Sequence, residues 1–320
     1  MAMLVGIDEA GYGPVLGPLV VTSVAFRVSE ARLADCLWDS LRESCTRDTR
    51  RGDPRLAVAD SKALKRSGGG LDALERTALV MLAAAGHSPA DLRELLRIVA
   101  PHSEELLAEY PWYAPLHLTL PVSRSVGDVG TRANAVRRDL HAQGVEWLGT
   151  FCECLPEGHF NRLVSRTRNK AVALLGLTFR VLDRALRLSP GERIRVFADR
   201  LGGRQHYREA IMTLLPGGEL RIIEESETRS AYRVEQRDRT CEIQFATRGE
   251  QRHFTTALAS VYSKYLRELF MHAFNRYWCG QMRGLRPTAG YYQDAQRWLG
   301  DAEGAIARLA VDRALLVRER

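Results

Sequence analysis

The chain has 320 residues, of which 45% are hydrophobic and 27% charged, enough to form one elaborated domain or two ordinary ones. It has no apolar run of membrane-spanning length and no signal-peptide pattern at its start, so we expect a soluble, cytoplasmic protein with no membrane partner. The formal net charge of +7 points to a polyanionic partner such as a nucleic acid.

The chain opens with an apolar run, residues 3–7, that leads two adjacent acids, Asp8 and Glu9, into a glycine-rich turn at residues 11–14. The apolar run predicts a short buried strand, and the Gly-Tyr-Gly-Pro sequence after it predicts a sharp turn. Successive side chains of a regular strand point to opposite faces, so both acids can serve one site only if the strand breaks beside them. The turn favours that break, although a solvated acidic turn is the ordinary role of such a pair.

The next segments predict a strand, two helices and a loop. Residues 19–26 are β-branched and apolar, and they predict a second strand antiparallel to the first. A serine at the start of residues 29–41 is suited to cap a helix there. The charged loop 46–55 leads to Asp60-Ser61-Lys62, and the apolar spacing in residues 71–85 predicts an amphipathic helix.

Residues 88–144 predict helices on either side of an aromatic loop. The first helix starts at Ser88-Pro89 and is broken by Pro101, whereas the last is rich in arginine and stops at Gly144. The loop 111–115 places Trp112 and Tyr113 between prolines. These rings could stack on bases, but aromatic residues in such a setting more often pack in the interior.

Residues 145–246 alternate between strand and helix patterns. The predicted elements are a strand over 145–155, a long helix over 159–188, a strand over 194–199, a helix over 204–215, and strands over 220–225, 232–236 and 242–246, of which the last two form a hairpin. Asp199 closes the strand 194–199, and an acid at the end of a core strand is a candidate site residue.

The apolar spacing in residues 257–278 predicts a long helix that carries Ser260, Lys264 and Glu268 at intervals of four on another face. This spacing places Lys264 beside Glu268, either as a surface ion pair or as part of a site. A turn over 287–292 with exposed aromatic residues and a helical tail complete the chain.

Four short blocks, in this order, resemble the type 2 ribonucleases H, the ribonuclease HII and HIII family. They are Asp8-Glu9-Ala10-Gly11-Tyr12-Gly13, Asp60-Ser61-Lys62-Ala63-Leu64, Phe197-Ala198-Asp199, and Ala257-Leu258-Ala259-Ser260 followed by Lys264 and Arg267-Glu268. The resemblance implies an α/β, ribonuclease H-like fold with a mixed central sheet flanked by helices. It would form a single elaborated domain over 1–320, with an inserted helical segment at about 88–144, an inserted β-hairpin at about 217–255 and a helical C-terminal extension at about 280–320.

The resemblance also implies a catalytic site. Carboxylates brought together raise one another's pKa, and hard divalent cations that prefer oxygen ligands relieve this repulsion. Two such ions can activate water and stabilise the leaving oxygen of a phosphodiester. The resemblance implies that Asp8, Glu9, Asp199 and Glu268 hold two ions of Mg²⁺ or Mn²⁺. It also implies that Lys264 is a catalytic residue. The substrate would be bound by Gly11, Tyr12, Gly13, Ser61, Lys62 and Tyr291.

The implied activity is cleavage of the RNA strand of RNA:DNA hybrids, or cleavage at ribonucleotides embedded in duplex DNA. Three residues depart from the family pattern: Tyr12 stands where the family has arginine or lysine, Arg200 where it has glycine, and Glu268 where ribonuclease HII has aspartate. Two alternatives therefore stay open: a nuclease of the same fold acting on other structured RNA or DNA, and a catalytically silent nucleic-acid-binding protein.

Overall fold

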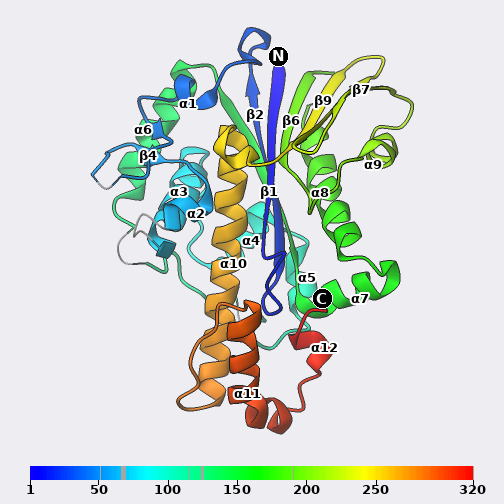
Figure 1. Cartoon of the computed structure of the whole chain (residues 1–320). Helices are drawn as coiled ribbons and strands as arrows, with labels where there is room; N and C mark the ends of the chain where they lie inside the picture. Colours follow the sequence, from blue (N-terminus) through cyan, green and yellow to red (C-terminus); the bar gives the residue numbers. More distant parts are fainter. Residues whose placement is uncertain (51, 66–69, 115, 124–125, 190, 320) are drawn as a thin grey trace.

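A seven-stranded mixed sheet runs through the centre of the molecule, with helices packed on both of its faces (Figure 1). The computed structural model describes residues 1–50, 52–65, 70–114, 116–123, 126–189 and 191–319. The strand order is β5-β2-β1-β6-β9-β8-β7. The predicted α/β class with a mixed, helix-flanked central sheet is therefore confirmed. No helix in the described ranges is long and apolar enough to cross a membrane.

The sheet combines an antiparallel half and a parallel centre. β1 pairs antiparallel with β2 and parallel with β6, and β6 pairs parallel with β9. The strands are β1 (Ala2–Ala10), β2 (Leu19–Val28), β5 (Glu146–Leu155), β6 (Arg193–Asp199), β7 (Glu219–Glu225), β8 (Arg229–Glu235) and β9 (Thr240–Ala246), with β3 (Cys45–Thr46) and β4 (Leu56–Ala57) forming a small separate pair. β8 and β9 make the predicted hairpin, and β9 is also a member of the parallel centre of the sheet.

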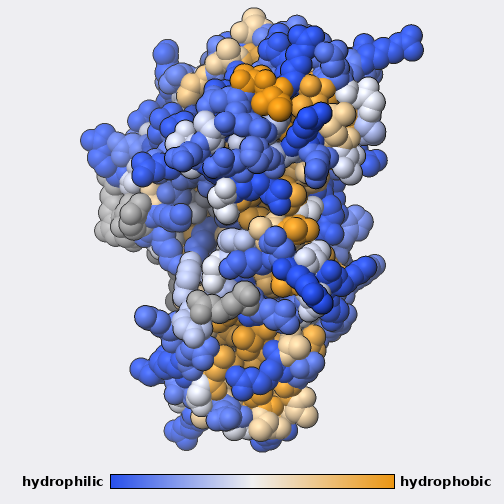
Figure 2. All heavy atoms as spheres, turned by 45° about the vertical axis from the view of Figure 1, so that its right-hand side comes forward, coloured by the Kyte–Doolittle hydropathy of each residue, from blue (hydrophilic) through white to orange (hydrophobic). Residues whose placement is uncertain are grey.

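The helices follow the chain around this sheet. They are α1 (Leu37–Ser40), α2 (Ser61–Leu64), α3 (Gly70–Ala84), α4 (Leu92–Val99), α5 (Ser103–Leu107), α6 (Val129–Ala142), α7 (Glu157–Thr167), α8 (Lys170–Leu186), α9 (Arg208–Leu214), α10 (Phe254–Gln281), α11 (Tyr292–Arg308) and α12 (Arg313–Leu316), with 3-10 turns η1 (Glu30–Arg32) and η3 (Gly249–Gln251). Hydrophilic residues cover most of the face shown in Figure 2, and apolar residues gather there in patches.

Successive side chains of β1 point to opposite faces of the sheet and so contribute to two separate halves of the core. Leu4 belongs to the cluster that contains α10, whereas Met3, Val5 and Ile7 belong to the cluster that contains α8. Gly6 lets α10 approach the sheet closely, because a Cβ atom there would lie 2.1 Å from the carbonyl carbon of Thr255. The long helix α10 therefore lies directly on the strand that carries Asp8 and Glu9 (Figure 1).

Three sequence predictions were wrong in detail. The helix predicted over 29–41 is only the turn η1 and the single-turn helix α1. The long helix predicted over 159–188 is two helices, because Arg168 adopts a left-handed conformation (φ 51°) and Asn169 caps α8 with its side chain. The strand break predicted beside Asp8 and Glu9 comes later, since β1 stays paired with β2 through Ala10.

The aromatic loop packs inside the molecule. Trp112 is 2% exposed and contacts the rings of Phe274 and Trp278 on α10, and Tyr113 is fully buried against Phe270. Pro115, the second proline of this loop, lies outside the described residues. Stacking of Trp112 and Tyr113 on bases is therefore excluded in this conformation, and packing is their role.

Candidate metal centre at the end of the central sheet

Asp8 and Asp199 lie at the ends of the two neighbouring parallel strands β1 and β6. The register pairs Ile7 with Ala198, so the acids that follow these residues reach the same edge of the sheet. Asp8 shares the strand face of Leu4, and Asp199 shares the face of Phe197; both faces pack in the cluster that contains α10. The sheet therefore brings together two acids that are 191 positions apart in the sequence.

Burial acts on both acids, and like charges act on Asp8. Burial raises the pKa of Asp8 well above its usual range, and the charges of Glu9 and Asp199 raise it further. Burial also raises the pKa of Asp199, although backbone N–H groups oppose the shift, among them Gly249 N at 3.3 Å from Asp199 Oδ1. A neighbouring cation would relieve this repulsion, so the electrostatics favour a positively charged ligand at this edge.

Glu9 reaches the same edge from the other face of β1. Because β1 is regular at this point, the side chain of Glu9 points away from that of Asp8. Its carboxylate nevertheless interacts with the same charges. Burial, and after it the charge of Asp199, raises the pKa of Glu9 to about 7, and the charge of Lys62 opposes this shift. Glu9 is thus electrostatically part of the cluster but approaches it from the side of α8.

α10 and α2 complete the surroundings of Asp8. The Ser260 hydroxyl hydrogen-bonds the Asp8 carboxylate and lies 3.0 Å from Ser61 Oγ at the start of α2. Ser263 Oγ donates to the backbone oxygen of Asp8 at 2.9 Å. Asp60 caps α2 by accepting a hydrogen bond from Lys62 N at 3.0 Å. The predicted residues Ser61 and Lys62 therefore do lie beside the acids.

Sequence reasoning missed an acid, Glu250, in the turn η3. Its carboxylate interacts electrostatically with Asp199, Asp60 and Lys62, and burial raises its pKa. Glu250 belongs to none of the four blocks, and it follows a strand by only a few residues in a charged stretch, so no pattern marked it. Its place becomes visible only because β9 pairs with β6 and delivers η3 to the end of that strand.

Glu268 occupies a different place. Its Oε1 atom is 2.8 Å from Lys264 Nζ and 3.0 Å from Lys65 Nζ, and although burial opposes it, these two lysines lower its pKa. Eight residues of helix separate Glu268 from Ser260, a rise of about 12 Å along α10. The structure confirms that Lys264 and Glu268 are neighbours but does not place Glu268 among the acids at the sheet edge.

In the glycine-rich turn over residues 11–14, only Gly11 requires glycine. Gly11 has φ +92°, and a Cβ atom there would lie 2.5 Å from the carbonyl oxygen of Pro18. Gly13 has open space around its Cα and an ordinary φ. Tyr12 lies on the side of α8, where Lys170 Nζ is 5.3 Å from the centre of its ring. The first residue of α8 thus places a positive charge over the face of the Tyr12 ring.

The late turn at Gly290 and Tyr291 is tied to this loop. Gly290 O accepts hydrogen bonds from Val15 N at 2.9 Å and Leu16 N at 3.2 Å. The next residue, Tyr291, is 53% exposed, with the guanidinium of Arg267 5.7 Å from the centre of its ring. The predicted substrate residues Gly11 and Tyr291 thus belong to one connected surface.

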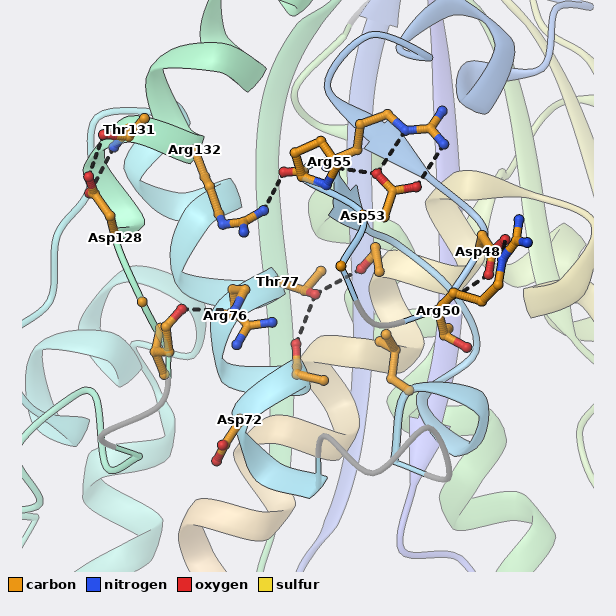
Figure 3. A pocket seen from close by; sticks show the side chains of 18 residues that line it. Asp48, Arg50, Asp53, Arg55, Asp72, Arg76, Thr77, Asp128, Thr131 and Arg132 are labelled. Atoms are coloured by element: carbon orange, nitrogen blue, oxygen red, sulfur yellow. Dashed lines mark hydrogen bonds and ion pairs between the residues drawn. The ribbon is translucent and has the colours of Figure 1, made fainter.

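A separate pocket of about 920 Å³ lies between the loop 48–55, α3 and the segment 126–132 (Figure 3). Two of the aspartates that line it are paired with arginine: Asp53 binds Arg55 at 2.8 Å, and Asp48 binds Arg50. Arg132 donates to the Pro54 backbone oxygen across the pocket. Because its charges neutralise one another and none of the predicted site residues is among those that line it, this pocket is not the candidate centre.

The donor set at the sheet edge fits a hard divalent cation. Carboxylate oxygens are the ligands that Mg²⁺ prefers, and a bound cation would oppose the rise in pKa that burial causes at Asp8 and Asp199. In the part of the chain that the structure describes, no three histidine, cysteine, aspartate or glutamate side chains are close enough to form a complete metal-binding group. Mg²⁺ does not need one, since it is commonly held by one or two carboxylates, water and substrate phosphate.

No family model and no curated protein matches the chain. Its structure is similar to ribonuclease HII of Archaeoglobus fulgidus, solved in complex with PCNA, at a TM-score of 0.45 and 16% identity, covering 99% of this chain and 94% of that one. It is also similar to ribonuclease H2 of Pyrococcus horikoshii, at a TM-score of 0.43 and 13% identity, covering 98% of this chain and 92% of that one. Bst-RNase HIII in complex with Mn²⁺ matches at a TM-score of 0.42 and 14% identity, covering 99% of this chain and 66% of that one. The chain is thus similar, at low identity, to proteins of the family that its motifs resemble.

Proposed function

We propose that this chain is a metal-dependent endoribonuclease that cleaves the RNA strand of RNA:DNA hybrids, or cleaves at ribonucleotides embedded in duplex DNA. The observation that carries the proposal is the convergence of Asp8, Glu9 and Asp199 at one edge of the sheet, where burial raises the pKa of each acid and like charge raises the pKa of Asp8 and Glu9 further. Such a cluster suits cations that act on phosphodiesters. The net charge of +7 suits a polyanionic substrate.

In this proposal Asp8 and Asp199 hold Mg²⁺ or Mn²⁺ together with water and substrate phosphate. Glu9, which approaches from the side of α8, and Glu268, which is paired with Lys264 and Lys65, are the further ligands that the family resemblance implies. When bound, two such ions supply an activated water molecule and stabilise the leaving oxygen. Ser260 orients the Asp8 carboxylate, and the backbone N–H of Gly249 orients that of Asp199. Lys62 lowers the pKa of Glu9 and Asp199, which favours the ionised form that a metal ligand requires.

The loop at residues 11–13 and Tyr291 are proposed to bind the substrate strand. A contact to the 2′-hydroxyl group is what allows a protein to distinguish RNA from DNA at a given position. The hydrogen bonds from Val15 and Leu16 to Gly290 fix the loop and Tyr291 relative to each other, as a shared recognition surface requires. Lys170 beside Tyr12 adds a positive charge at the same surface.

The proposal is tested by cleavage of three labelled duplexes, each with Mg²⁺ and with Mn²⁺: an RNA:DNA hybrid, a DNA duplex with one ribonucleotide, and an all-DNA duplex. We expect cleavage of one or both ribonucleotide-containing duplexes, with the all-DNA duplex left intact. Cleavage of all three would instead identify a nuclease of broader specificity. Absence of cleavage of every duplex with both metals would contradict the proposal.

The catalytic assignment is tested by Asp8→Asn and Asp199→Asn. Each substitution removes a charged ligand while keeping the side-chain shape, so we expect turnover to fall by more than about 100-fold. Asp35→Asn, at an exposed position away from the site, is the matched control and should retain wild-type turnover. Wild-type turnover in the Asp8 or Asp199 variant would overturn the assignment.

A further inference from the structure

Glu250 is a buried acid whose carboxylate is only partly satisfied. The residue is 9% exposed, and its Oε2 atom is inaccessible to solvent and has no hydrogen-bond partner among the described residues. Burying a carboxylate oxygen without a partner costs free energy, so such a group is kept where something else uses it. A bound cation would compensate this buried, unpartnered oxygen of Glu250.

The backbone next to Glu250 contacts the end of β6. Gly249 N donates to Asp199 Oδ1, and a Cβ atom on Gly249 would lie 3.4 Å from the backbone oxygen of Ala198. Arg248, in a left-handed conformation (φ 59°), turns the chain sharply out of β9 and into η3. The turn thus holds the Glu250 carboxylate within electrostatic range of Asp199 and Asp60.

Lys62, an exposed residue, is the described cation whose charge opposes the raised pKa of Glu250. Lys62 also interacts with Glu9 and Asp199, so a single ammonium group serves three carboxylates. Glu268, in contrast, is paired with both Lys264 and Lys65. A bound cation at the end of β6 would therefore add positive charge beside both Asp199 and Glu250.

We infer that Glu250 is a ligand of a divalent cation that it holds jointly with Asp199. The inference deepens the proposed function, on which it rests, by adding a carboxylate that none of the four sequence blocks contains. Two carboxylates with water molecules and a substrate phosphate are a sufficient ligand set for Mg²⁺ or Mn²⁺. Asp60, which interacts with Glu250 through space, is committed to capping α2 and contributes charge rather than a ligand.

The test is Mn²⁺ binding to the full chain without nucleic acid, measured by titration calorimetry. Glu250→Gln keeps the shape of the side chain and removes its charge, so we expect Mn²⁺ affinity to fall roughly 10- to 100-fold. Glu303→Gln, at an exposed position on α11, is the matched control and should bind Mn²⁺ like the wild type. Equal Mn²⁺ affinity in the wild type and the Glu250→Gln variant would overturn the inference.

Thermal unfolding in EDTA separates this role from a structural one. The Glu250→Gln variant should unfold at or above the wild-type temperature, because a neutral amide removes an under-compensated buried charge, and it should gain less stability from Mn²⁺ than the wild type. If the amide fails to fold, Glu250→Asp keeps the charge and should bind Mn²⁺ with intermediate affinity; unchanged affinity in that variant would overturn the inference.

The binding measurement also distinguishes this inference from the proposed function. Wild-type protein that binds Mn²⁺ through Glu250 but cleaves none of the three duplexes would support the cation site and contradict the nuclease. Cleavage by a wild-type protein whose Mn²⁺ affinity does not depend on Glu250 would support the nuclease and reject the additional ligand.

Discussion

Glu157 shows how one buried side chain makes stability depend on pH. It is fully buried at the start of α7, where Oε1 accepts hydrogen bonds from Gly17 N at 2.8 Å and from the Tyr113 hydroxyl at 3.0 Å. Burial raises its pKa from 4.5 to about 7. Because the folded state binds the proton more tightly than the unfolded state, the stability that Glu157 contributes is present below pH 4.5 and is lost as the pH rises through 7.

We therefore expect the free energy of unfolding to decrease between pH 4.5 and 7, and Glu157→Gln to remove part of that decrease. The measurement is urea unfolding of both proteins across this pH range in EDTA. Glu9, whose pKa is also raised to about 7, titrates in both proteins, so the difference between the two profiles isolates Glu157. Parallel profiles would show that Glu157 does not carry a raised pKa.

At the residue scale, the sequence predicted the acids that lie in recognisable motifs and missed Glu250, which lies in no motif. Asp8, Glu9 and Asp199 stand in blocks with a recognisable order, and the register of β1 and β6 brings them to one edge. Glu250 lies 51 positions after Asp199 and owes its place to a long-range strand pairing. Burial of a single carboxylate oxygen is a tertiary property, which local sequence patterns do not encode.

At the scale of elements, the sequence predicted helices and strands wherever the hydrophobic spacing is regular. It missed their ends where the conformation or pairing of a single residue sets the boundary. α3 and α10 follow from apolar periodicity and appear close to their predicted bounds. The boundary between α7 and α8 depends on the left-handed conformation of Arg168, a conformation that no propensity favours for arginine. β1 continues past the two acids because pairing with β2 outweighs the local tendency of the glycines to turn.

The C-terminal segment after α12 holds the glycine-rich loop in place. Arg318 is 2% exposed, its guanidinium donates to the backbone oxygens of Gly11 and Pro14, and its backbone N donates to Val15 O at 2.8 Å. Asn161 on α7 anchors the same segment by donating to the backbone oxygens of Ala314 and Val317 at 2.8 and 2.7 Å. The end of the chain therefore positions the loop that follows the first two acids.

Arg318→Met keeps the bulk of the side chain and removes these donors. We expect the free energy of unfolding to fall by about 1–3 kcal/mol, because buried carbonyl oxygens lose their partners. We also expect KM for a ribonucleotide-containing duplex to rise more than kcat falls, since the loop is proposed to bind substrate rather than to react. Arg313→Met, at an exposed position on α12, is the control. A variant with wild-type stability and wild-type KM would show that Arg318 does not position the loop.

At the scale of the whole molecule, the sheet order explains why one edge collects so much negative charge. The strands β1, β6 and β9 are parallel, so their C-terminal ends open at the same edge, and the chain leaves them at Gly11, Arg200 and Thr247. α10 covers one face at this edge and α8 approaches from the other (Figure 1). The ends of parallel strands are where open α/β sheets commonly place their ligand sites.

The sequence alone predicted the mixed sheet and its helical cover, but it treated β9 as part of an added hairpin. Alternating hydrophobicity identifies a strand without identifying its neighbour in the sheet, because strands paired on either side show the same pattern. The pairing of β9 with β6 makes η3, and with it Glu250, part of the candidate centre. The largest gap in the sequence-based picture of the site therefore follows from a single undetermined strand pairing.

The most direct test of the central claim is anomalous diffraction from crystals of the full chain grown with Mn²⁺. The account predicts an anomalous peak at the shared end of β1 and β6, within bonding distance of carboxylate oxygens of Asp8 and Asp199. A well-ordered sheet edge in crystals equilibrated with millimolar Mn²⁺, with anomalous signal elsewhere or nowhere, would contradict it.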